Sequence, residues 1–234
     1  MSNKTLIQTI RYLLAGRNTI PCKITNRLKY ITDSDIMAFS SMNRSTHPYE
    51  ALRHNENFQI YWKDVTIDSA SMESIILARE IAKIEDFIIF RGDSKDGLLY
   101  SAGNLSAKPL DYLTVGNAAK SVDIGIELLC ADGYDDRLGF SLLLNKKQYT
   151  ELIHSYMEIP YLKSLLRGGG VYHTEIPCGT GLLLPSMTPN HNYFNINVDM
   201  DWKIVNLTKN TYRVAVSINS TVNNPHMICR IENI

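Results

Sequence analysis

An apolar stripe at helical spacing between residues 67 and 93 is the feature that most constrains the fold. Asp68 or Ser69 can cap a helix here. The polar stretch at residues 92–97 ends it. The apolar positions fall on one face, with charged residues largely opposite: Leu77, Ala78, Ile81, Ile84 and Ile88. The sequence therefore predicts a long amphipathic helix that buries one face.

The rest of the chain mixes helical and extended patterns. Residues 18–61 are mostly polar, with only short apolar groups. This pattern predicts an extended segment with little core of its own, which packs on another part of the chain or on a neighbouring subunit. Short β-prone segments separated by Asn, Asp and Pro fill the last third. Other expected elements are a helix at 5–15, a helix at 110–130, a buried strand at 140–144 and a helix from Lys146. The predicted fold class is α+β, with an antiparallel sheet at the end.

Composition excludes several classes of protein. The 234 residues are 44% hydrophobic and 21% charged, and 24 basic residues balance 24 acidic ones. A neutral chain has no long-range attraction for nucleic acid or an anionic membrane, so neither partner is expected. The sequence shows no secretory signal and no window apolar enough to cross a membrane. The scattered cysteines predict reduced thiols in a cytoplasmic protein: Cys22, Cys130, Cys178 and Cys229.

No catalytic constellation emerges from the candidate motifs. Glu85 and Asp86 are adjacent, so on a helix they point about 100° apart and cannot both face one substrate atom. Residues 173–178, HTEIPC, lack the spacing of a zinc deaminase site. The glycines of 167–170, RGGG, follow a helix, which favours a helix stop over a phosphate loop. Residues 91–93, RGD, match a cell-adhesion tripeptide in their letters alone, without any supporting feature. We expect no enzyme activity, no metal and no cofactor.

Four blocks, read in order, resemble a known family. They are LLAGR at 13–17, the helix segment at 67–93, LLRGGGVYHTEI at 165–176 and NNPHMI at 223–228. Their sequence and spacing are similar to the encapsulins, shell proteins of bacteria and archaea with the capsid fold of HK97-type tailed phages. The most specific part is A-x-x-E-D-x-x-I-F-R-G at 82–92.

The resemblance implies a division of the chain. Residues 1–17 would be an N-terminal helix or arm, and 18–66 would be an E-loop that pairs with a neighbouring subunit. Residues 67–106 would be the P-domain with its spine helix, 107–186 the A-domain, and 187–234 the C-terminal sheet part of the P-domain.

The resemblance also implies a function. Many copies would close into an icosahedral shell, a nanocompartment in the cytoplasm, without catalysis by the shell itself. Such shells enclose a cargo enzyme, such as a ferritin-like iron oxidase or a dye-decolorising peroxidase, through a peptide at the cargo's C-terminus. The alternative is a major capsid protein of a phage or prophage that packages nucleic acid. Most members have a longer N-terminal helix, which places cargo docking by the usual route in question.

Site residues follow from the resemblance only. Leu6, Ile10 and Leu13 are candidates to face cargo, and Trp62 is a weak candidate for contact with a flavin. The pore-lining loop of the family matches His154, Ser155, Tyr156, Met157 and Glu158. The bland alternative for this loop is an ordinary surface loop.

Overall fold

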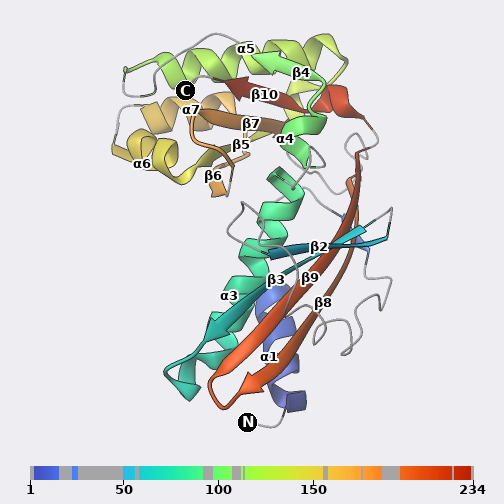
Figure 1. Cartoon of the computed structure of the whole chain (residues 1–234). Helices are drawn as coiled ribbons and strands as arrows, with labels where there is room; N and C mark the ends of the chain where they lie inside the picture. Colours follow the sequence, from blue (N-terminus) through green and yellow to red (C-terminus); the bar gives the residue numbers. More distant parts are fainter. Residues whose placement is uncertain are drawn as a thin grey trace. The chain divides into compact units, whose positions relative to one another are not determined.

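The computed structural model divides the chain into two compact units. Unit 1 comprises Met1–Thr19, Lys23–Asp86 and Asn197–Ser220, and unit 2 comprises Ile20–Cys22, Phe87–Ile196 and Thr221–Ile234. Figure 1 labels most helices and strands of each unit. The structure describes residues 3–15, 23–25, 50–55, 58–91, 97–106, 112, 114–154, 158–174, 176–185, 196–222 and 224–232.

A five-stranded sheet forms the centre of unit 1, in the order β1-β8-β9-β3-β2. Strand β1 runs parallel to β8, whereas β2 with β3 and β3 with β9 are antiparallel. The long strands β8 and β9 are separated only by a turn at 209–210. The strands are β1 (Lys23–Thr25), β2 (Glu50–Asn55), β3 (Phe58–Thr66), β8 (Ile196–Thr208) and β9 (Thr211–Val222).

Two helices pack together in unit 1. Helix α1 (Asn3–Ala15) lies against α3 (Glu73–Asp86), which follows the short 3-10 turn η2 (Ala70–Met72) and contacts β3. The predicted apolar stripe is confirmed, because Leu77, Ala78, Ile81 and Ile84 are all buried. After α3 the chain continues as a π-helical turn, η3 (Phe87–Arg91), whose first four residues are buried.

Buried charges connect the elements of unit 1. Glu80 of α3 accepts hydrogen bonds from Lys63 of β3 at 2.9 Å and from Lys83 at 2.7 Å. Burial alone would raise the pKa of the Glu80 carboxyl, but the hydrogen bonds from Lys83 and Lys63 outweigh it and hold this pKa below its usual range. Arg213 of β9 pairs with both carboxylate oxygens of Asp64 on β3, each at 2.6 Å. These contacts link β3 to α3 and to β9.

Unit 2 also holds a five-stranded sheet, in the order β4-β10-β7-β5-β6. Neighbours β4 with β10 and β5 with β6 are parallel, and the other two pairs are antiparallel. The strands are β4 (Asn104–Ser106), β5 (Phe140–Asn145), β6 (Val171–Thr174), β7 (Thr180–Pro185) and β10 (Cys229–Glu232). The central strands are solidly apolar, as expected for strands removed from water on both faces.

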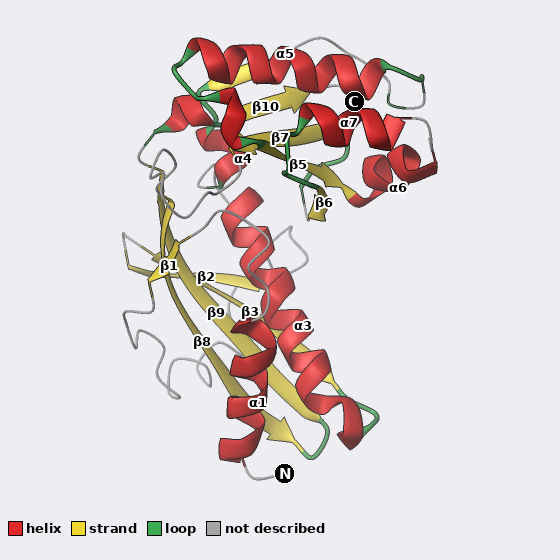
Figure 2. Ribbon diagram, turned by 180° about the vertical axis from the view of Figure 1, so that it is seen from behind, coloured by secondary structure: helices red, strands yellow, loops and turns green. Residues whose placement is uncertain are grey.

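Helices cover this sheet (Figure 2). Helix α5 (Asn117–Ala131) packs on β4, β10 and β7 and contacts α7 (Glu158–Leu165). Helix α6 (Lys146–His154) packs on β5 and β6 and contacts α7. Three single turns complete the unit: α4 (Leu98–Ser101), η4 (Asp136–Leu138) and η5 (Pro225–Met227).

Two expectations need correction, and one alternative is settled for part of the chain. The helix expected from residue 110 begins at Asn117, because Gly116 has φ 92°, which cannot continue a right-handed helix. Residues 58–61, expected to pack on another part of the chain or on a neighbouring subunit, pack on their own chain, because Ile60 and Tyr61 are buried where β3 pairs with β9. The late β segments do not form a single sheet, since β8 and β9 lie in unit 1 and β10 in unit 2. The division into E-loop, P-domain and A-domain stays a prediction.

Candidate functional site

The loop between α6 and α7 is the candidate pore loop. His154 is the last residue of α6 and is exposed, and Glu158 is the first residue of α7. Ser155, Tyr156 and Met157 lie outside the described residues. The structure therefore places the two ends of this loop on helices of unit 2, and its role as a pore stays a prediction.

Asn145 fixes where α6 starts. Its Oδ1 accepts a hydrogen bond from the backbone N–H of Lys147 at 2.9 Å, which is the contact that a helix N-cap makes. Its Nδ2 donates to the carbonyl oxygen of Ile176 at 2.6 Å. One side chain thus begins α6 directly after β5 and also holds the segment that precedes β7.

The glycine-rich stretch after α7 is a helix stop. Arg167 has φ 48° and Gly168 has φ 94°, so two consecutive residues adopt the left-handed conformation that ends helices. The backbone N–H of Gly169 donates to the carbonyl oxygen of Leu166 at 3.0 Å. The interpretation of RGGG as a helix stop is confirmed.

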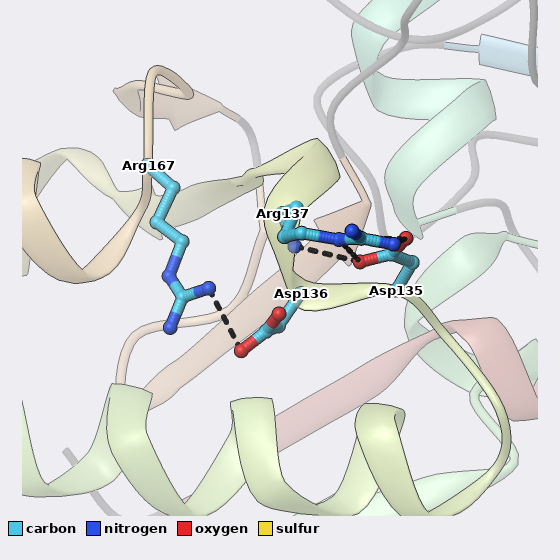
Figure 3. A network of polar contacts seen from close by, with 4 residues as sticks. All are labelled: Asp135, Asp136, Arg137 and Arg167. Atoms are coloured by element: carbon cyan, nitrogen blue, oxygen red, sulfur yellow. Dashed lines mark hydrogen bonds and ion pairs between the residues drawn. The ribbon is translucent and has the colours of Figure 1, made fainter.

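A polar network joins this stop to the turn after α5 (Figure 3). Asp135 accepts a hydrogen bond from the backbone N–H of Arg137 at 3.0 Å and binds the guanidinium of Arg137 through both carboxylate oxygens. Arg167 pairs with Asp136 at 2.7 Å. Beside these pairs, Phe140 at the start of β5 donates its N–H to the carbonyl oxygen of Leu166 at 2.8 Å. The network secures two turns of unit 2, and its four charges are already paired with one another.

The chemistry around this network does not favour a nucleophile. Burial raises the pKa of the Cys130 thiol, and the carboxylate of Asp136 raises it further against the opposing effect of Arg167. A thiol of this kind stays protonated and weakly reactive near neutral pH. Cys130, Cys178 and Cys229 are all free thiols. Within the described residues, no group of three His, Cys, Asp or Glu side chains could hold a metal ion.

The remaining candidate residues lie in unit 1. Leu6 is 4% exposed and Ile10 is fully buried, so both belong to the core that α1 forms with α3, whereas Leu13 is 37% exposed. A cargo-facing position stays a prediction for Leu13. Trp62 lies on β3 and is 1% exposed, so its ring is packed within the unit. Contact of Trp62 with a flavin stays a prediction.

Sequence reasoning missed the residues that organise unit 2. Asn145 and the Asp135–Arg137 and Asp136–Arg167 pairs are polar residues in turns, and only their long-range partners give them importance. The cap at Asn145 had a usable signal, because an Asn directly before a helical pattern is a preferred N-cap. The partner of Arg167 had no such local signal, because about thirty residues separate it from Asp136 in the chain.

Comparison with known proteins gives the family and the fold. A family profile described as "Encapsulating protein for peroxidase" matches residues 33–223. No curated protein matches the sequence. A virus-like particle from Pyrococcus furiosus superposes with a TM-score of 0.60 at 14% identity, covering 98% of this chain and 99% of that chain. A phage-related protein from Bordetella bronchiseptica RB50 superposes with a TM-score of 0.49 at 14% identity, covering 99% and 97%.

The family match and the superposition on the virus-like particle agree with the α+β architecture of both units, which is an HK97-type capsid fold. No described helix is both long and apolar enough to cross a membrane. The matched profile covers most of the chain and describes structural shell proteins, not an enzyme family. The chain belongs to the encapsulin family.

Proposed function

We propose that many copies of this chain assemble into a closed shell that encloses a cargo protein. The observation that carries the proposal is the match of the encapsulating-protein profile to residues 33–223. Binding energy in such an assembly is spread over extended interfaces and is not concentrated in a pocket.

The proposed cargo is a peroxidase, which the family description names, and a ferritin-like iron oxidase is the other cargo class expected from the resemblance. Cargo would dock through a peptide at its C-terminus, and the shell would need no cofactor of its own. We place the shell in the cytoplasm, because the described cysteines are free thiols and disulfides are rare there.

Electron microscopy of the purified protein tests assembly directly. Size-exclusion chromatography with the 260/280 nm absorbance ratio on the same peak, followed by negative staining, is expected to show closed particles with a protein-like ratio. Particles with a nucleic-acid ratio would favour the capsid alternative, and a monomer would contradict both. Dye oxidation by hydrogen peroxide in the particle fraction, together with mass spectrometry of co-purifying proteins, then separates a peroxidase cargo from an iron oxidase.

A further inference from the structure

We propose that the acidic exposed side of α5 in one copy docks on the basic exposed sides of α6 and α7 in the next copy. The inference rests on the proposed shell and deepens it, since it names the surfaces through which one copy binds another. Both surfaces belong to unit 2, so each can be described within a single compact unit.

The acidic surface follows one side of α5. The exposed residues of the helix recur at spacings of three and four, which places them on one face: Lys120, Asp123, Glu127 and Ala131. Asp132 is exposed directly after the helix. We call Asp123, Glu127 and Asp132 the acidic face. Neither Asp123 nor Glu127 forms an ion pair within the described part of the chain, and their like charges, four residues apart, repel. A cationic partner would relieve this repulsion.

The basic surface is formed by α6, α7 and the turn after α7. We call its exposed cations the basic face: Lys146, Lys147, Lys163 and Arg167. Lys147 pairs with Glu151 at 3.6 Å and Arg167 with Asp136. Among the described residues, Lys146 and Lys163 have no ion-pair partner. Lys146 also occupies the first position of α6, where the helix dipole disfavours a positive charge. The only other carboxylate in the two helices is that of Glu158.

Helix α6, which carries Lys146 and Lys147, lies toward the opposite edge of the sheet from α5, whereas α7, which carries Lys163, contacts both helices. Helix α5 packs on β4 and β10 at one edge, whereas α6 packs on β5 and β6 at the other (Figure 2). A head-to-tail contact needs this arrangement, because each copy binds one neighbour with its first surface and leaves the second surface for the next. Repeated contacts of this kind produce a ring when the rotation closes.

Exposed apolar side chains lie on α6 and α7 and just before α5. Tyr161 on α7 is 58% exposed and Ile153 on α6 is 37% exposed. Val115, two residues before α5, is 68% exposed. Aromatic residues are enriched in protein interfaces, and covering apolar side chains stabilises association. The charges would then set the partner and its orientation, whereas the apolar residues would add affinity.

Charge reversal on each face tests the contact. The acidic-face variant is Asp123→Lys with Glu127→Lys, and the basic-face variant is Lys146→Glu with Lys163→Glu. Each variant alone places like charges in contact, so the fraction of chain in the particle peak is expected to fall by roughly tenfold or more. The chain that carries all four substitutions restores opposite charges and is expected to assemble again. Light scattering on a size-exclusion column and negative-stain microscopy, both near 0.1 M salt, provide the readout.

A matched control separates contact from net charge. Arg79→Glu with Lys209→Glu changes the net charge as much as the basic-face variant does, but both residues are exposed in unit 1. Added to the acidic-face variant, this pair is expected to leave the chain unassembled. Reassembly of that control, or normal assembly of either single-face variant, would overturn the inference.

Two further checks keep the outcomes distinct. Circular dichroism is expected to show that every variant stays folded; if one is not, the neutral versions Asp123→Asn with Glu127→Gln and Lys146→Gln with Lys163→Gln replace the reversals. Their particles are expected to dissociate at lower salt than wild-type particles, and an unchanged salt midpoint would overturn the contact. A wild-type chain that never assembles would contradict the shell proposal itself. If the wild-type chain and the charge-reversed variants all assemble equally well, only the proposed contact between copies is contradicted.

Discussion

The sheets of the two units have the same number of strands but differ in how completely they are buried. In unit 2, the central strands β5 and β7 place Leu142, Leu143 and Leu144, and Leu182, Leu183 and Leu184, at 0% exposure. In unit 1, β8 is half-buried from 201 to 205, and Asn206 and Thr208 are exposed. The central strands of the unit 2 sheet are therefore covered by their own chain, whereas β8 of the unit 1 sheet remains partly exposed to solvent.

The difference follows from residue type. Consecutive leucines require cover on both faces of a strand, so β5 and β7 predict a sheet with packing on each side. Strand β8 carries charged and polar residues among its apolar ones, so it tolerates partial contact with water. In a chain proposed to assemble, such a strand retains area that a neighbouring copy could cover, whereas β5 and β7 have none left.

The largest expected effect is in the core of unit 1, where Ile81→Asp should prevent folding. Ile81 is fully buried on α3, and an unpaired carboxylate there would cost more than about 4 kcal/mol. Soluble yield and circular dichroism measure the loss. The control is Arg79→Asp on the exposed side of the same helix, which should change stability by only about 0.5 kcal/mol. A soluble, folded Ile81→Asp chain would show that the position of Ile81 on α3 is as accessible to solvent as β8 is.

Matched truncations in the two sheets test the comparison itself. Leu183→Ala in β7 should lower the free energy of unfolding by about 2–5 kcal/mol, because a cavity remains in a closed core. Ile204→Ala in the half-buried β8 should cost about 1 kcal/mol, since its site can relax into water. Urea denaturation of the unassembled chain gives both values. Equal losses at the two positions would remove the distinction between the sheets.

Two glycines of unit 2 allow the effect of backbone conformation on stability to be distinguished from the effect of close packing. Gly133 and Gly139 both have positive φ, 93° and 81°. A Cβ on Gly133 would meet nothing within 4 Å, whereas one on Gly139 would lie 2.6 Å from the carbonyl oxygen of Arg167. Gly133→Ala should therefore cost about 1 kcal/mol from conformation alone. Gly139→Ala should cost about 2–3 kcal/mol, because the clash adds to it. Thermal unfolding that ranks the two variants equally would argue against close packing of Gly139 on the backbone of Arg167.

The sequence predicted those elements whose signal is local. The stripe of α3, the strand β5 and the glycine stop after α7 each depend on periodicity or on turn chemistry within a few residues. The start of α5 was misplaced because apolar residues before Gly116 continued the helical pattern, whereas the positive φ of Gly116 broke it.

Features that depend on distant partners could not be predicted. The sequence predicted that residues 58–61 of β3 pack on another part of the chain or on a neighbouring subunit, but it did not identify β9, far along the chain, as the strand that pairs with β3 and buries Ile60 and Trp62. The same holds for the candidate contact between copies. The charges of Lys146 and Asp123 are visible in the sequence, but their places at opposite edges of one sheet come from the pairing order of its strands.

The smallest expected effect is the pH dependence of the stability that Glu80 contributes. This buried carboxylate links α3 to β3 in unit 1, so its protonation tests how far unit 1 depends on a charged contact. The lysine hydrogen bonds keep the pKa of Glu80 below its ordinary value of 4.5, so the folded chain binds this proton less readily than the unfolded chain does. Stability from Glu80 is therefore present above about pH 4.5 and is lost as pH falls through the lowered pKa.

Glu80→Gln should accordingly cost about 1 kcal/mol near neutral pH, and its difference from wild type should shrink in acid. Urea unfolding across this range measures the difference at each pH. The control is Glu127→Gln on the exposed face of α5, where no ion pair is lost within the described chain and the free energy of unfolding of the unassembled protein near neutral pH should change by only about 0.5 kcal/mol. A Glu80→Gln difference that stays constant into acid would mean that the two lysines contribute nothing to the charged carboxylate. The attachment of α3 to β3 would then depend on apolar packing alone.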